Sequence, residues 1–188
     1  MKLIKLEVGG AQVAALSELK HLSQLTLVEQ RPIDLTRLGS LTDLDELHIL
    51  GVPVLDFSPF AGLSRLKKLQ VIAFFQFSGT APVAHAEVLG NLISLEALTL
   101  TGLQIQNLDF AKNLRDLREL YLSHLPITSI EPLKKLGIRK MSLTDIPVTD
   151  VSTLLDLPDF TELSILRTPA REDVLRELER RGVKVNRL

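Results

Sequence analysis

Three residue types that hydrolases use stand close together in the second half of the chain. Ser123 and His124 are adjacent, and Asp145 follows His124 by 21 residues. A serine nucleophile needs a histidine base within hydrogen-bonding reach and donors for the oxyanion. Successive side chains of a strand point to opposite faces, so Ser123 and His124 at a strand end are expected to point apart. Arg167 stands one repeat further on, 22 residues after Asp145, which favours a stacked ladder of polar side chains over a small hydrolase.

Metal and cofactor chemistry finds equally little support in the sequence. The chain has no cysteine and four histidines. His48 and His124 are expected on one face of a sheet but three strands apart, about 14 Å at the usual strand spacing, which is too far for a shared ion. There is no phosphate-binding glycine loop. We therefore predict no metal, no cofactor and no enzymatic activity.

Composition limits the partners and the location. The 188 residues carry a net charge of −1 and are 45% hydrophobic, a poor footprint for nucleic acid or an anionic membrane. No apolar run reaches the roughly 18 residues of a membrane span. Lys5 and Glu7 interrupt the first apolar positions, unlike a secretory signal. We expect a cytoplasmic protein, with the alternative that the chain is a fragment whose targeting segments were removed.

One apolar pattern recurs along the whole chain and must position all of these residues. It is Leu-x-x-Leu-x-Leu with conservative replacements, and it starts at Leu3, Leu22, Leu44, Leu66, Leu95, Leu117, Ile138 and Phe160. The starts are separated by 19, 22, 22, 29, 22, 21 and 22 residues. The last two apolar residues of each copy are two positions apart, as on one face of a strand. Such a period is typical of a solenoid of stacked units.

A second apolar set lies between the strands at three-residue spacing, as in Ile130-x-x-Leu133-x-x-Leu136. This spacing suits a short helix or a 3₁₀ turn. Asp34, Asp56 and Asp150 directly precede such segments and are candidates to cap them. The pattern predicts an α/β solenoid, in which a curved parallel sheet forms the concave side and short helices or 3₁₀ turns form the convex side.

The units resemble bacterial leucine-rich repeats of the 22-residue, internalin-like type, and residues 117–136 are the closest copy. This resemblance implies a single domain over residues 1–188, with about eight repeats in 1–166. The chain departs from the family pattern because it lacks the asparagine ladder after the strands. Residues 167–188 are predicted to form a capping helix and an edge strand, because Val174, Leu175 and Leu178 share one helical face. The first repeat shows no cap, and self-association through it is a further prediction.

The exposed side of the predicted sheet carries one apolar run. Val28, Leu50 and Ile72 occupy the same position in three consecutive repeats, and contiguous exposed apolar surface often marks a binding site. Ordinary packing at the edge of the long fourth repeat is the alternative. The sequence-based interaction site is Val28, His48, Leu50, Gln70, Ile72, Phe75, Phe77 and Tyr121. Phe75 and Phe77 lie in that repeat's insertion, where they either fold back onto the solenoid or stand out as anchors.

These observations favour a protein-protein interaction module that binds another protein on its concave face. A small cytoplasmic inhibitor, an immunity protein or a scaffold fits this description. The alternative is a structural or adhesin-arm fragment of a larger bacterial surface or effector protein. A small hydrolase at Ser123, His124 and Asp145 is the third hypothesis.

Overall fold

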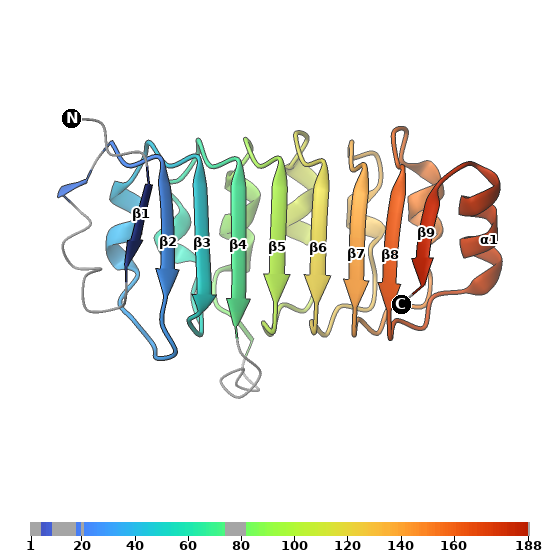
Figure 1. Ribbon diagram of the computed structural model, residues 1–188, viewed down its shortest axis with the longest axis horizontal. Coiled ribbons are helices and arrows are strands. Elements are labelled where there is room, and N and C mark those ends of the chain that lie inside the picture. Colours follow the sequence, from blue (N-terminus) through green and yellow to red (C-terminus); the bar gives the residue numbers. More distant parts are fainter. Residues whose placement is uncertain (1–4, 9–17, 20, 74–81, 188) are drawn as a thin grey trace.

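Every predicted apolar triplet contributes to a strand. The structure is a computed structural model that describes residues 5–8, 18–19, 21–73 and 82–187. Over these residues the chain forms one sheet of nine parallel strands in sequence order, seen as a row from blue to red in Figure 1. The strands are β1 (Lys5–Val8), β2 (Gln24–Val28), β3 (Glu46–Gly51), β4 (Lys68–Ala73), β5 (Ala97–Thr101), β6 (Glu119–Ser123), β7 (Lys140–Thr144), β8 (Glu162–Leu166) and β9 (Lys184–Arg187). The predicted solenoid fold is confirmed.

Burial alternates along each strand as the two-residue period requires. The middle apolar residues of the triplets in the second to eighth repeats, where we expect the strands to centre, are all at most 2% exposed: Leu25, Leu47, Leu69, Leu98, Leu120, Met141 and Leu163. They align in register from strand to strand, so that Leu98 pairs with Leu120 and Leu120 with Met141. Among the described residues no polar or charged residue is buried. The core is therefore a continuous apolar layer between the sheet and the convex segments.

Short 3₁₀ segments form the convex layer behind the sheet (Figure 1). They are η2 (Thr36–Ser40), η3 (Ser58–Phe60), η5 (Ala86–Asn91), η6 (Asp109–Asn113), η7 (Glu131–Leu133) and η8 (Ser152–Asp156). The aspartates expected to cap these segments stand one residue before the N-cap, and the carboxylates of Asp34, Asp56 and Asp150 accept the backbone N–H two residues on at 2.8–2.9 Å. Asn107 and Ser129 do the same in their repeats. A polar side chain at this position satisfies a donor that the short turn leaves open.

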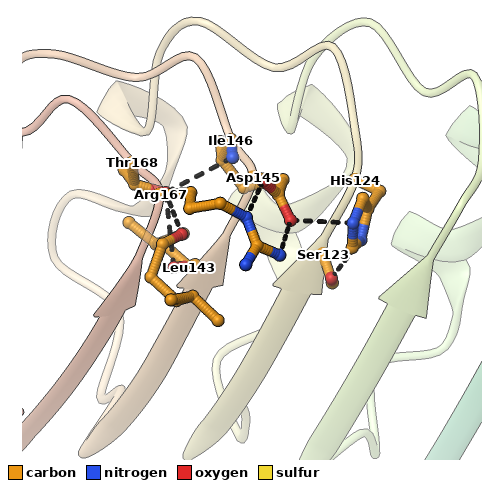
Figure 2. Close-up of polar contacts among 8 residues, drawn as sticks. Ser123, His124, Leu143, Asp145, Ile146, Arg167 and Thr168 are labelled. Carbon is orange, nitrogen blue, oxygen red and sulfur yellow. Dashed lines mark hydrogen bonds and ion pairs between the residues drawn. The ribbon is translucent and has the colours of Figure 1, made fainter. Parts of the chain in front are cut away.

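The position of the missing asparagine ladder is filled by apolar side chains. Val52, Leu103, Leu125 and Ile146 there are all at most 3% exposed. Thr168 is the polar exception. Its hydroxyl accepts the N–H of Ile146 and lies 3.3 Å from the carbonyl oxygens of two strand residues, Leu143 and Leu166 (Figure 2). Thr168 thus ties the last two repeats together through one hydroxyl.

The predicted cap closes the C-terminal end. Helix α1 (Glu172–Arg180) buries Val174, Leu175 and Leu178 and is followed by Gly182 at φ +86°, the left-handed conformation common after helices. Lys184 of β9 pairs with Glu162 of β8 at 3.2 Å. The basic residues of α1 are bound to carboxylates of the same segment, as Arg176 is to Glu172. No helix within the described ranges is long and apolar enough to cross a membrane.

Candidate functional site

The three aliphatic residues singled out in the sequence are neighbours in the sheet. Val28 of β2 pairs with Leu50 of β3, which pairs with Ile72 of β4. All three alternate with buried residues and so point to the open, concave face. Val28 is 45% exposed, and the other two are half-buried. We call these three residues the aliphatic row. At Thr101 of β5, the partner of Ile72, the row ends.

Polar side chains run beside the aliphatic row and are paired with one another. His48 Nδ1 lies 2.8 Å from Gln70 Oε1, and its Nε2 lies 3.8 Å from the Glu46 carboxylate. Glu46 also binds the Lys68 ammonium at 3.1 Å. The border of the row is therefore polar but carries little net charge, because the Glu46 carboxylate and the Lys68 ammonium neutralise each other.

The predicted aromatic residues fall into two groups. Phe75 and Phe77 lie outside the described residues, so their role as anchors stays a prediction. Tyr121 lies on β6, two strands beyond β4, where its hydroxyl donates to the Glu119 carboxylate at 3.0 Å. Burial raises the pKa of the Tyr121 phenol, and the bond to Glu119 adds to the effect. Tyr121 is thus held in one position on the same face as the aliphatic row but separate from it.

A set of hydroxyls, of which the sequence analysis singled out only Ser123, covers the concave face from β5 to β8. We call it the hydroxyl grid, and its members are Thr99, Thr101, Ser123, Ser142, Thr144 and Ser164. All six are half-buried and alternate with buried residues. Thr101, Ser123 and Thr144 are register partners across three strands. The alternation Thr-x-Thr and Ser-x-Thr was the signal in the sequence.

Ser123, His124 and Asp145 form a continuous chain of contacts at the carboxyl ends of the strands (Figure 2). Ser123 Oγ lies 2.6 Å from His124 Nδ1, and His124 Nε2 lies 2.7 Å from Asp145 Oδ2. Arg167 donates twice to Asp145 at 2.6 Å. The expectation that Ser123 and His124 point apart is wrong. His124 has φ +54°, so the strand alternation stops there and the imidazole turns back beside Ser123.

The polar ladder itself is confirmed, and its geometry favours a structural role. His124, Asp145 and Arg167 all have positive φ, between 47° and 54°, a conformation that costs about 1–2 kcal/mol for residues with a Cβ atom. The bidentate bond from Arg167 holds the pKa of the Asp145 carboxyl below its usual range. Each ladder residue thus forms contacts that offset a strained turn.

An oxyanion would find few donors beside Ser123. The N–H groups of Gly102, His124 and Asp145 donate to carbonyls of the following repeats, Ser123, Thr144 and Leu166, at 2.9–3.0 Å. Ser123 and His124 are in contact, but these three N–H groups are already bound to carbonyls and so are not preorganised donors for an oxyanion. No cluster of three potential metal ligands occurs in the part of the chain that the structure describes.

Comparison with known proteins identifies the repeat architecture. No family model matches the sequence, and no curated protein matches it either. An internalin (inlF) from Listeria monocytogenes superposes with a TM-score of 0.80 over 98% of this chain, at 21% sequence identity. Internalin C2 from the same species gives a TM-score of 0.81 over 98%, at 25% identity. The chain has the leucine-rich-repeat fold. The resemblance to internalin-like repeats that the sequence indicated is thereby confirmed.

Leucine-rich-repeat chains of other kingdoms share this fold. The ectodomain of the Arabidopsis receptor kinase HAESA, in complex with an IDA peptide hormone ligand, matches 100% of this chain with a TM-score of 0.70 at 16% identity. The chain spans 55% of the length of the first internalin and 33% of the receptor ectodomain. These similarities concern the repeat architecture, and they indicate no catalytic family.

Proposed function

We propose that this leucine-rich-repeat chain binds a protein partner on its concave face, centred on strands β2 to β4. The aliphatic row carries this proposal. Val28, Leu50 and Ile72 are contiguous and partly exposed, although the fold requires burial only of the alternate residues. An aliphatic side chain of a partner that covers the row removes apolar surface from water on both molecules, which contributes about 25 cal/mol per Å² buried.

The surroundings of the row favour a protein over a charged polymer. Glu46 and Lys68 neutralise each other at 3.1 Å, and His48 and Gln70 offer hydrogen-bonding groups next to the apolar side chains. An apolar centre with a polar rim is typical of protein interfaces. A leucine-rich-repeat ectodomain with the same fold is known in complex with a peptide hormone. Tyr121 is a candidate second anchor, since tyrosine is enriched among interface residues that dominate affinity.

Two biological roles are consistent with such a face. The first is a cytoplasmic inhibitor, immunity protein or scaffold, in which the concave face sequesters a single protein. The alternative is a structural or adhesin arm of a larger surface protein, which the similarity in fold to internalins favours. Both roles use the same surface, so one experiment on the face applies to either.

The test is capture of the partner from the native host, followed by titration calorimetry with the purified partner and variants of this chain. Leu50→Glu and Phe75→Ala are each expected to weaken binding by at least about 1–2 kcal/mol. The melting temperature of Leu50→Glu should hardly change, because a partly exposed site tolerates charge.

The matched control is Lys134→Glu, which changes an exposed residue on the convex side and is expected to bind normally. Unfolding of Leu50→Glu would mean that the row belongs to the core. Unchanged stability together with unchanged affinity would mean that the partner uses another surface.

A further inference from the structure

A cavity of about 320 Å³ lies between the last repeat and the C-terminal cap, beside α1 at the red end of the solenoid (Figure 1). Leu154 of η8 lines it from the repeat, and Leu178 of α1 and Val183 line it from the cap. Among the described residues no strand member lines it, so this cavity is separate from the aliphatic row and the hydroxyl grid. Its volume is within the range of pockets that hold small molecules, about 300–1,000 Å³.

The cavity arises because the cap is an α-helix, whereas the preceding repeats continue with 3₁₀ segments. The segments η5 and η6 pack closely on each other, but α1 packs less closely on η8. The walls are nevertheless core residues, since Leu154 and Leu178 are each 1% exposed. A ligand that enters between them therefore meets side chains that the fold already holds in place.

Pro158 and Phe160 extend the apolar surface of the cavity. Both also line a more open hollow that adjoins it before β8. Phe160 is the only aromatic residue at the first position of the repeated triplets, where the other copies hold leucine or isoleucine. An aromatic ring packs against other rings in offset or edge-on geometry, so this wall suits a ligand with an apolar ring.

Guanidinium groups outnumber carboxylates where the cap meets the cavity. Arg181, which lines it, donates from Nε to Glu177 at 3.0 Å and from Nη1 to the Leu155 carbonyl oxygen at 3.0 Å. Arg180 binds the same Glu177 carboxylate at 3.0 Å, so one acid faces two bases. Within the described ranges, nothing accepts a hydrogen bond from Nη2 of Arg181. One positive charge is therefore left without a matching carboxylate.

The other carboxylates beside the cavity already have cationic partners. Asp156, which lines it, lies 3.8 Å from the Lys134 ammonium. Asp159, which lines the adjoining hollow, lies 3.8 Å from the Arg139 guanidinium. These pairs leave the excess at Arg181 uncompensated, and an anionic ligand complements it.

We infer that this cavity binds a small organic anion, whose apolar body lies between η8 and α1 and whose acidic group meets Arg181. Arginine presents its N–H groups in a planar fork that matches a carboxylate or a related oxyanion. Charged residues are depleted in the centres of protein interfaces. The charged side chains Asp156 and Arg181 line this cavity, which favours a small ligand over a protein. The site is independent of the proposed function, because it shares no residue with the aliphatic row.

The test uses two fluorescent probes with the same apolar rings and different charge. Anilinonaphthalene sulfonate carries an anionic group, and its analogue phenylnaphthylamine lacks it. Fluorescence titration of the whole chain should show one saturable site for the sulfonate probe. The uncharged probe should bind about tenfold more weakly, since it cannot form the charge-assisted hydrogen bond to Arg181.

The variant Arg181→Gln should lower the affinity for the sulfonate probe about tenfold and leave the affinity for the uncharged probe unchanged. The matched control is Arg176→Gln. Arg176 also pairs with a glutamate four residues away, Glu172 at 3.2 Å, but it does not line the cavity. The control should bind both probes like the unmodified chain.

Several outcomes would overturn the inference. They are equal affinities for the two probes, no binding of either probe, and a sulfonate affinity that Arg181→Gln leaves unchanged. Binding that Leu50→Glu abolishes and Arg181→Gln does not would place the probe on the aliphatic row.

Arg181→Gln also removes the bond to the Leu155 carbonyl oxygen, so the unfolding transition of each variant is recorded. Should Arg181→Gln lose its cooperative transition, Leu155→Glu is measured in its place. Leu155 is half-buried and lines the cavity, and a carboxylate there should repel the sulfonate probe. An unchanged affinity of Leu155→Glu for this probe would also overturn the inference.

Discussion

Strands β2 to β4 and strands β5 to β8 have the same interior and different exteriors. Leu47 and Leu120 occupy equivalent buried positions and are both at most 1% exposed. At the outward positions the first region presents the aliphatic row and the second presents the hydroxyl grid. The fold therefore requires apolar residues at the inward positions of each strand and leaves the outward positions free to differ from repeat to repeat.

The largest expected effect tests whether the two interiors are equivalent. Leu120→Ala and Leu47→Ala should each lower the free energy of unfolding by about 2–5 kcal/mol, because both leave a cavity in a close-packed layer. Chemical denaturation of the two variants measures the loss. A loss in only one region would show that the two interiors are not packed alike.

The turn column after the strands gives the next largest effect. Gly102 has φ +71°, and a Cβ atom there would lie 2.6 Å from the carbonyl oxygen of Ala73. Gly102→Ala should therefore cost at least about 1–2 kcal/mol of stability. His124 tolerates a Cβ atom at the next position of this column, where its imidazole also binds Asp145. A denaturant midpoint for Gly102→Ala equal to that of the unmodified chain would contradict the close approach.

A smaller effect depends on pH and concerns the contact between the third repeat and the segment that follows the insertion. The hydrogen bond to Asp56 raises the pKa of His85 above 6.5, and the two side chains are 2.9 Å apart. The stability from this pair is fully present below pH 6.5 and is lost as pH rises through the raised pKa. Asp56 has a pKa of about 2, chiefly because it accepts the Ser58 N–H, so it stays ionised throughout this window.

The variant His85→Asn checks that assignment. Its denaturation midpoint should fall below that of the unmodified chain by more at pH 5 than at pH 8. An equal difference at both pH values would show that the protonated imidazole adds nothing to the contact.

The smallest expected effect concerns Ser123. The Ser123 hydroxyl contacts the partly exposed His124 side chain, so Ser123→Ala should change the stability by no more than about 0.5 kcal/mol. Because the neighbouring N–H groups already donate to carbonyls, the unmodified chain should not react with a fluorophosphonate probe. Stoichiometric labelling of Ser123 would instead establish that the contact with His124 activates the hydroxyl.

The sequence predicted the features that repeat and missed those that depend on backbone conformation. The strand centres and the caps at Asp34, Asp56 and Asp150 follow from spacing alone, and they are where the spacing places them. The contact between Ser123 and His124 depends on the sign of one φ angle, which the alternation rule does not contain.

Two other contacts were not predictable because they join neighbouring repeats. Thr168 reaches back to the Ile146 N–H, and its type differs from the apolar residues of its column. The Arg118 guanidinium lies against Gly137, so close that a Cβ atom added to this glycine would stand 2.6 Å from it. The sequence analysis predicted the aliphatic row together with His48, Gln70 and Tyr121, and it did not treat the alternating Ser and Thr residues of the hydroxyl grid as one surface.

The strict sequence order of the nine strands has a consequence for how the chain reaches this structure. Each new strand docks on the one before it after closing a loop of about one repeat, and the entropy of closing a loop grows only slowly with its length. Folding is then a series of similar small steps instead of one distant encounter. Such one-dimensional growth can begin at any pair of repeats and spread in both directions. Substitutions that strengthen one pair are expected to move the starting point along the chain while the final structure stays the same.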